Sequence, residues 1–231
     1  PYTANSLNND LQRTMIQQLQ ALNRRQQFRP GLLSLLTNAN HFTKRGIYKG
    51  ILRHASSCKG ILLDVGCGNK PYRDLFRVEE YTGIDIDNPA HDHSNEPVDV
   101  IYDGRNIPFP DNRFDSVFSS EVFEHVFHPE ELLREIHRVL KPGGRFFCLE
   151  FSRVVLPVFR ELYDAYSFNV LPRIGQVVTG DAESYQYLVE SIRKFPDQES
   201  LCQRINAAGF VRSRYVNLSG GIAAIHSAWR V

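Results

Sequence analysis

The residues of this sequence best suited to ligand chemistry are short polar side chains that each follow a run of apolar residues. Asp64 follows the run Ile61–Leu63 and leads at once into the turn Gly66-Cys67-Gly68. Glycine has no Cβ, so backbone N–H groups in such a turn can approach a ligand closely. An acid beside the turn can accept hydrogen bonds from an amine or a hydroxyl. Because a strand that ends in a glycine turn is common, its interpretation depends on the residues later in the chain.

An acid or a hydroxyl also closes each of the next three predicted strands. The strands are predicted over residues 81–86, 98–102 and 114–119, and the polar residues are Asp85, Asp103 and Ser120. Strands that alternate with helices predict a mostly parallel, doubly wound sheet. Ligands of such sheets bind at the carboxyl ends of the strands. We therefore expect these polar residues to share one ligand site with Asp64.

The periodicity of the rest of the chain predicts the elements that position this site. Pro129–Leu140 has an apolar stripe at helical spacing and a proline suited to a first turn. A turn at 141–144 precedes a fifth strand over Arg145–Phe151, and two more strands flank Ser219-Gly220-Gly221 as a hairpin. The predicted fold is a Rossmann-like, doubly wound, mostly parallel seven-stranded sheet with a C-terminal antiparallel hairpin.

The sequence before the glycine turn predicts a separate helical arm. Apolar residues recur there at helical spacing, namely Leu7, Leu11, Met15, Leu19 and Leu22. We expect an N-terminal helical arm or cap over residues 1–57 and one domain over 58–231, with a helical cover over about 152–208. This arm could dock on the domain or on another subunit, and its role stays open.

Composition restricts the classes of function. The 231 residues carry 27 basic and 26 acidic side chains, so no basic field indicates a nucleic-acid partner. The four cysteines have no close pair, which is typical of reduced thiols rather than of a disulfide framework or a zinc site. Glu121, Glu124, His125 and His128 lie close together, but without a second cluster we expect no metal site. No apolar run reaches the roughly 18–20 residues that span a bilayer, so we expect a cytoplasmic protein.

The glycine turn favours a ligand without phosphates. A dinucleotide site typically has Gly-x-Gly-x-x-Gly, whereas here Pro71 stands where the third glycine would be. Asp85 lies 21 residues after Asp64 and suits the diol of a ribose. An adenine ring needs flat apolar walls and a polar edge, which Ile86 and the Asp103-Gly104 loop can supply.

These motifs together resemble those of class I S-adenosylmethionine-dependent methyltransferases. The matching segments cover residues 60–150 and are LLDVGCG, GIDID, DGRNIPFPDNRFD, SSEVFEHV and LLREIHRVLKPGG. The resemblance implies S-adenosylmethionine as the cofactor. It also implies these cofactor-binding residues: Asp64, Gly66, Cys67, Gly68, Asn69, Asp85, Ile86, Asp103, Gly104 and Ser120.

The C-terminal part carries a narrower resemblance. From Leu149 onward, LEFSRVVLPVFRELYDAYSFNVLPRIGQVV, SYQYLVESIRKFPDQESL and NLSGGIAAIH resemble the ubiquinone/menaquinone biosynthesis C-methyltransferase family. Residues 60–148 are more similar to general small-molecule methyltransferases: Val122 and Glu124 stand where the quinone family has glycine and arginine. Two lineages thus meet near Phe146–Leu149, as a hybrid or as a divergent natural member.

The second resemblance implies C-methylation of a demethylated benzoquinol or naphthoquinol. A ring carbon becomes nucleophilic when a hydroxyl with a pKa near ~10 loses its proton to a base within about 3 Å. We expect His125 to be this base, and the alternative is that it only orders its loop. Two other functions stay open: methylation of another small molecule, and an inactive cofactor-binding partner in an assembly. A prenylated substrate would favour transient contact with a membrane surface, and the sequence leaves the oligomeric state open.

Overall fold

A computed structural model describes residues 28, 41–87, 97–155 and 194–231. The chain divides into two units, Pro1–Lys49 and Gly50–Val231. Helix α3 (His41–Ala55) begins in the first unit, where the Lys44 ammonium lies 5.6 Å from the centroid of the Phe28 ring. Residues 1–27 of the predicted arm and 156–193 of the predicted cover lie outside the described residues, and the domain boundary after residue 57 stays a prediction.

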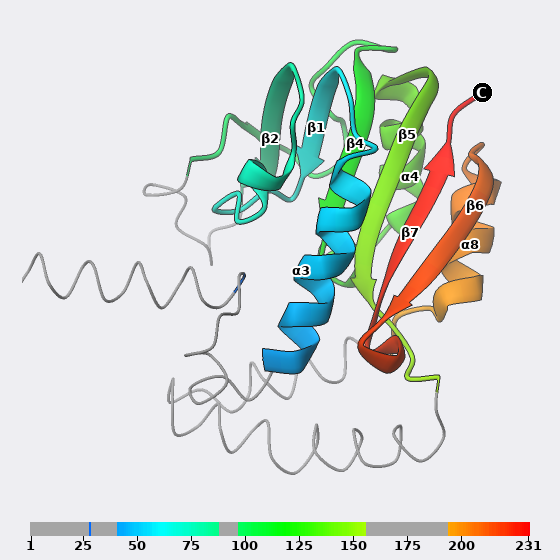
Figure 1. Cartoon of the computed structure of the whole chain (residues 1–231). Helices are drawn as coiled ribbons and strands as arrows, with labels where there is room; N and C mark the ends of the chain where they lie inside the picture. The colour runs from blue at the N-terminus through cyan, green and yellow to red at the C-terminus, as the bar shows by residue number, and fades with distance from the viewer. Residues whose placement is uncertain (1–27, 29–40, 88–96, 156–193) are drawn as a thin grey trace, which may run out of the picture. The chain divides into compact units, whose positions relative to one another are not determined.

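The second unit is built on one seven-stranded sheet (Figure 1). Its strands are β1 (Ile61–Val65), β2 (Glu80–Ile86), β3 (Val100–Tyr102), β4 (Phe114–Ser120), β5 (Leu140–Phe151), β6 (Val211–Leu218) and β7 (Ala223–Trp229). They are arranged in the order β3-β2-β1-β4-β5-β7-β6. Strands β1 to β5 pair in parallel, and β7 pairs antiparallel with both β5 and β6. The Rossmann-like sheet with its C-terminal antiparallel hairpin is therefore confirmed.

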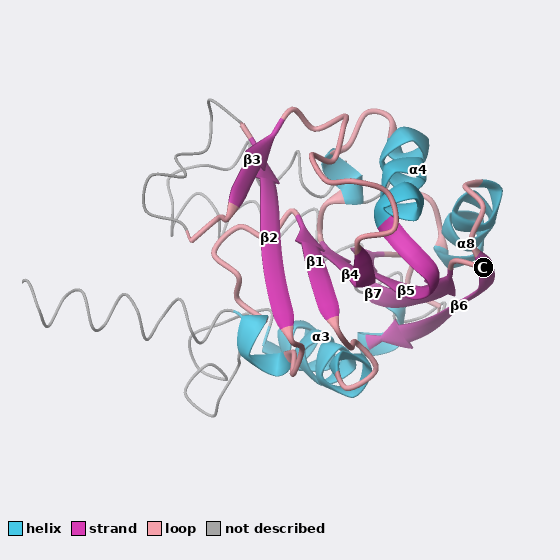
Figure 2. Ribbon diagram, turned by 90° about the horizontal axis from the view of Figure 1, so that it is seen from above, coloured by secondary structure: helices cyan, strands magenta, loops and turns pink. Residues whose placement is uncertain are grey.

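Helices cover both faces of this sheet, as Figure 2 shows from above. Helices α4 (Pro129–Val139) and α8 (Gln198–Ala207) lie on one face, and the last turns of α3 lie on the other. The apolar stripe predicted for α4 is buried, because residues three and four apart share one helix face. In α3, the His54 ring packs edge-on against Phe147 of β5, with ring centroids 5.8 Å apart.

The helix α4 ends one residue earlier than predicted, and β5 starts before the predicted Arg145. Leu140 already pairs with Phe114, and the pairing of the two strands shifts between Phe114 and Ser116. Gly143 absorbs the irregularity with φ at +78°, a conformation that glycine adopts without strain. The expected helix-ending turn is thus part of the strand, because the neighbouring chain offers it hydrogen bonds.

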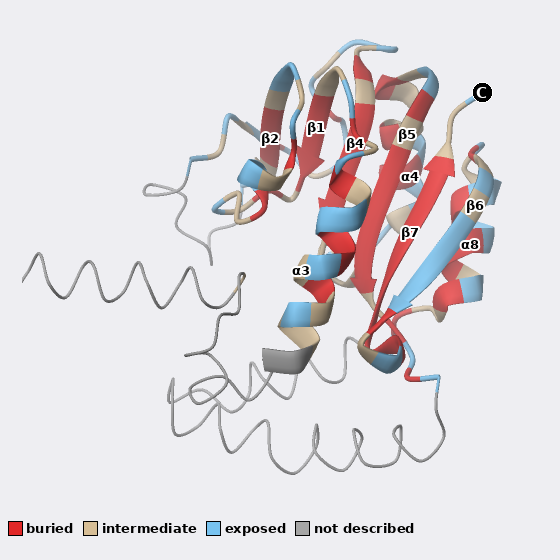
Figure 3. Ribbon diagram, in the orientation of Figure 1, coloured by how far each residue is buried: buried red, intermediate tan, exposed pale blue. Residues whose placement is uncertain are grey.

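Burial falls steeply from the middle of the sheet to its edge strand β6. Figure 3 shows β1, β4, β5 and β7 as mostly buried and β6 as mostly exposed. The pairing of β6 with β7 shifts between Val211 and Arg214, and Arg212 within that bulge has φ at +54°. Strands that are covered on both faces are nearly continuous apolar runs, which explains why β1 and β4 were recognisable.

Candidate functional site

The turn after β1 leaves an open space beside its backbone. The N–H groups of Gly66 and Cys67 both donate to Ile84 O of β2, at 2.9 and 3.0 Å. A Cβ on Gly66 would lie 2.2 Å from a methyl carbon of Val122, so the loop after β4 packs directly on this glycine. A Cβ on Gly68 would meet no atom within 4 Å, and Gly68 also has positive φ. A ligand can therefore approach the main chain at Gly68.

Asp85 joins the first two predicted parts of the site. Its Oδ2 accepts a hydrogen bond from Gly68 N at 2.8 Å, and its Oδ1 accepts one from Ile86 N at 2.8 Å. A carboxylate oxygen can accept more than one hydrogen bond, so both oxygens keep capacity for hydroxyl donors. Ile86 is exposed and lies against Gly104, where a Cβ would be 3.2 Å from its Cγ2. Gly68, Asp85, Ile86 and Gly104 are thus brought together at the carboxyl edge of the sheet.

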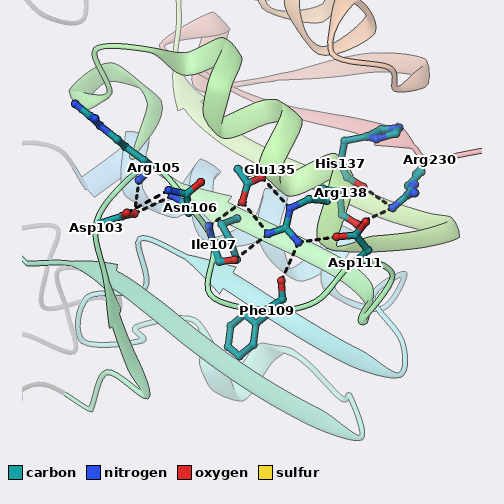
Figure 4. Close-up of polar contacts among 10 residues, drawn as sticks. All are labelled: Asp103, Arg105, Asn106, Ile107, Phe109, Asp111, Glu135, His137, Arg138 and Arg230. Atoms are coloured by element: carbon teal, nitrogen blue, oxygen red, sulfur yellow. Dashed lines mark hydrogen bonds and ion pairs between the residues drawn. The ribbon is translucent and has the colours of Figure 1, made fainter.

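Asp103 folds back on its own loop. Its Oδ1 accepts hydrogen bonds from Arg105 N and Asn106 N, each at 2.8 Å (Figure 4). These bonds, the one from Asn106 first, lower the pKa of Asp103 below its usual value. In the described structure this carboxylate therefore stabilises the conformation of the predicted adenine loop, to which it belongs.

Arg138 of α4 fastens that loop to the domain (Figure 4). Its guanidinium binds both carboxylate oxygens of Glu135 at 2.8 Å and Asp111 Oδ1 at 2.8 Å. It also donates to the carbonyls of Ile107 and Phe109, each at 2.9 Å. Glu135 in turn accepts from Ile107 N at 2.9 Å. Three of the five guanidinium bonds reach the loop, and with the bond from Ile107 N to Glu135 they give it a fixed position relative to α4.

Asp64 is buried within β1 rather than exposed at the turn. The hydroxyl of Tyr81 donates a short hydrogen bond to its Oδ2. Burial raises the pKa of Asp64 to about 7, and the charge of Asp85 adds to the rise, against the opposing effects of Tyr81 and Lys70. Near neutral pH the carboxyl is therefore divided between its two protonation states.

A lysine after the turn braces β2 in a way that the sequence did not reveal. Lys70 Nζ lies 2.5 Å from Asp99 Oδ2, which also accepts from Gly83 N at 2.6 Å. A Cβ on Gly83 would come within 2.4 Å of Lys70 Cε, so the lysine crosses the strand where glycine leaves room. Asn69 lies exposed on the same turn, and Ser120 is half-buried at the end of β4.

His125, the predicted base, lies in a short turn, η3 (Phe123–His125), after β4. Its side chain is 52% exposed, and its Nε2 lies 3.8 Å from Oε1 of Glu124, whose side chain is only 1% exposed. An imidazole with one face toward solvent and a carboxylate behind it suits a proton acceptor. The neighbouring Phe127 is 96% exposed.

Behind His125, two buried carboxyl groups meet. Glu150 of β5 is completely buried, and its Oε1 accepts from Val122 N and Phe123 N at 3.1 and 3.0 Å. Burial, followed by the charge of Glu124 and a hydrogen bond with it, raises the pKa of Glu150 well above its usual value. Glu150 therefore stays protonated, since ionising it in the interior beside a second carboxyl group is unfavourable. A glutamate inside the apolar run FFCLEF was the available signal in the sequence.

Two further observations bear on the class of site. Among the residues that the structure describes, no group of three or more His, Cys, Asp or Glu side chains is placed to hold a metal ion. Within the same residues, no helix is both long enough and apolar enough to cross a membrane.

Comparison with known proteins extends these observations. The model of the ubiE/COQ5 methyltransferase family matches residues 89–230, more than half of the chain. The match begins earlier than Leu149, where the sequence first resembles quinone enzymes. The chain is 54% identical over 132 residues to the mitochondrial 2-methoxy-6-polyprenyl-1,4-benzoquinol methylase of Danio rerio, over 57% of this chain and 40% of that protein. It is 53% identical over 132 residues to the ubiquinone/menaquinone biosynthesis C-methyltransferase UbiE of Brucella canis, over 57% of this chain and 49% of that protein. The matched region thus spans half or less of these relatives.

Solved structures share the fold at low sequence identity. An S-adenosylmethionine-dependent methyltransferase from Aquifex aeolicus is 18% identical with a TM-score of 0.51, covering 79% of this chain and 89% of its own. A possible exported protein from Bordetella parapertussis is 13% identical with a TM-score of 0.58, covering 83% of this chain and 69% of its own.

Proposed function

We propose, from the premise that this chain belongs to the ubiE/COQ5 methyltransferase family, that it methylates a ring carbon of a demethylated benzoquinol or naphthoquinol. The names of the two relatives support this substrate class. The observation that carries the proposal is the open backbone at Gly68 beside the Asp85 carboxylate. It lies on the edge where sheets of this kind bind their ligands.

The residues at this edge fit S-adenosylmethionine. Asp85 can accept hydrogen bonds from ribose hydroxyls while it keeps its bond from Gly68 N. Ile86 and Gly104 offer an apolar wall to the adenine ring. The carboxyl of Asp64 can ionise and pair with the amino group of the cofactor. The roles proposed for Cys67, Asn69, Asp103 and Ser120 rest on their positions in the sequence motifs. When bound, the cofactor supplies an electrophilic methyl group on a sulfonium.

The residues of the chain have two roles in the reaction: they orient the substrate and accept a proton. His125 takes the proton from the ring hydroxyl, which raises the electron density on the ring carbon. Oε1 of Glu124 lies 3.8 Å from its Nε2, so the imidazole is positioned beside a carboxyl group. Glu150 holds the backbone of this loop through Val122 and Phe123.

The exposed ring of Phe127 suits an apolar substrate. An aromatic side chain that is almost fully exposed beside the proposed base can contact a prenyl tail. We propose transient contact with a membrane surface through such a substrate.

Two measurements on purified protein test the function. The first is calorimetric titration with S-adenosylhomocysteine, and the second is turnover of a demethylated quinol with a short prenyl tail. We expect His125→Ala to lower kcat by about 10²–10⁴-fold, the usual contribution of a general base. His128→Ala is the matched control, because His128 is exposed nearby and its side chain forms no cap to α4.

The outcomes separate the alternatives. Absence of cofactor binding would refute every methyltransferase proposal. Tight binding with turnover of other phenols only would indicate another small-molecule acceptor, and tight binding without any turnover would indicate an inactive partner protein. Equal activity of the two histidine variants would exclude His125 as the base.

A further inference from the structure

A cavity of about 530 Å³ lies at the amino ends of the parallel strands, the edge opposite the proposed cofactor site. Its walls come from the segment before β1, the starts of β4 and β5, and the end of β7; they include Lys59, Asp115, Lys141, Arg145 and Trp229. The volume falls within the range of about 300–1,000 Å³ that small-molecule sites occupy. The methyltransferase chemistry makes no use of this edge.

Arg145 gives the cavity a fixed cation. Its guanidinium carbon lies 4.8 Å from the ring centroid of Phe147 and 4.3 Å from that of Trp229. Its Nε is buried, and no hydrogen-bond acceptor reaches that atom within the described chain. Two rings that hold a guanidinium by its faces leave its N–H edge available to an oxyanion.

The charge of Arg145 is not neutralised by the described residues around it. Burial, followed by the charge of Arg214, lowers its pKa, although a guanidinium stays protonated in proteins. No carboxylate in the described part of the chain forms an ion pair with it. A half-buried cation in the field of a second cation is unfavourable unless an anion joins it.

The one acid of the cavity already has partners. Both oxygens of Asp115 lie 2.8 Å from Lys141 Nζ, and Oδ2 also accepts from Ile61 N at 2.9 Å. Burial acts against its ionisation, but these bonds prevail and lower its pKa. The ammonium of Lys59 has no ion-pair partner among the described residues. The cavity thus carries three cations, Lys59, Lys141 and Arg145, against the one carboxylate of Asp115. Ser56 and Ser57 add hydroxyl groups at its wall.

We propose that this cavity binds a phosphate group, with the Arg145 edge and the Lys59 ammonium as its ligands. Planar, forked guanidinium donors match the geometry of phosphate oxygens, and a lysine adds charge without a strict direction. The group is either a free phosphate or the headgroup of an anionic phospholipid, which share this chemistry. The proposal does not depend on methyl transfer.

The test uses the full chain in a buffer free of phosphate. One arm is calorimetric titration with inorganic phosphate, and the other is flotation with phosphatidylglycerol vesicles against phosphatidylcholine vesicles. The variants are Arg145→Leu and Lys59→Met, with Arg134→Gln as the control. Arg134 is exposed on α4, so its loss lowers the net charge equally without touching the cavity.

We expect binding to weaken about tenfold or more in Arg145→Leu, and about three- to fivefold in Lys59→Met. Arg134→Gln should bind as the parent does. Saturable binding of inorganic phosphate identifies a free phosphate, whereas flotation with the anionic vesicles alone identifies a headgroup. The proposal is overturned if neither probe binds, or if all three variants behave alike. Lys59 is exposed, so Lys59→Met keeps the test decisive should Arg145→Leu fail to fold.

Discussion

The carboxyl of Asp64 is subject to two opposing demands. Its burial favours the neutral form, whereas an ammonium group of a ligand would need the charged form. The pKa of about 7 in the folded protein lies above the usual value of 3.8. The folded state therefore binds more protons than the unfolded state between these two values. The stability that Asp64 contributes is complete below about pH 4 and is lost as the pH rises through 7.

Asp64→Asn should consequently stabilise the cofactor-free protein above pH 7 by about 1–4 kcal/mol and change little near pH 4. Urea unfolding at both pH values measures this, with the exposed Glu79→Gln as a control for the loss of one charge. The same variant should bind S-adenosylhomocysteine more weakly. A variant less stable than the parent at pH 8 would contradict the assigned direction of the shift.

Glu150 allows a second test with paired substitutions. In Glu150→Gln, the amide oxygen can still accept from Val122 N and Phe123 N, as the protonated acid does. We expect its unfolding free energy to lie within about 1 kcal/mol of the parent. Glu150→Leu leaves both N–H groups without an acceptor and should cost about 2–4 kcal/mol. Urea unfolding at pH 7 compares them; equal losses in both would show that Glu150 is ionised.

The sequence predicted these residues unequally, for a physical reason. Gly68 and Asp85 were found because each lies at or just after the carboxyl end of its own strand. The Tyr81 bond to Asp64 and the contact of Glu150 with Glu124 join different strands or loops. Such contacts depend on which strands are neighbours, and strand order is not encoded in local spacing.

At the scale of elements, α4 serves as the anchor of the loop at 103–111. Arg138→Met would leave the carbonyls of Ile107 and Phe109 without their donor, and it would leave Glu135 with the Ile107 N–H alone. We expect a loss of about 2–4 kcal/mol in unfolding free energy and weaker binding of S-adenosylhomocysteine. Hydrogen exchange over 103–111 should rise in the variant.

Arg134→Met on the same helix provides the control, because Arg134 is exposed and makes no such bonds. Unchanged exchange at 103–111 in Arg138→Met would contradict the anchoring role. The sequence predicted this helix and its buried stripe, but it did not reveal that the half-buried Arg138 in its last turn holds a loop.

At the scale of the whole molecule, the two proposed ligands occupy opposite edges of one sheet. Sites this far apart without shared partners usually contribute independently, within about 0.5 kcal/mol. A ligand at a hundred times its Kd stabilises by about 2.7 kcal/mol. S-adenosylhomocysteine and phosphate together should therefore stabilise by the sum of their separate effects. Thermal unfolding with each and with both measures this, and a departure of more than about 1 kcal/mol would show coupling.

The fold as a whole was predictable to a large extent. Apolar runs that alternate with helical segments specified the first five strands, and the glycines of Ser219-Gly220-Gly221 specified the hairpin. The start of β5 at Leu140 was not predictable, because it depends on hydrogen bonds offered by Phe114. The helical content expected within 156–193 lies outside the described residues.

The bulge at Arg212 has a consequence for self-association. Every open sheet offers unpaired backbone groups at its two outer strands, and a strand of another copy can add there. Here one outer strand, β3, is only three residues long. The other, β6, is kinked at Arg212 and carries a second charge at Arg214. The kink and the two charges both disfavour pairing with a strand of another copy. Deletion of Arg212 would straighten that border, and light scattering of the concentrated variant should then reveal aggregates that the parent avoids.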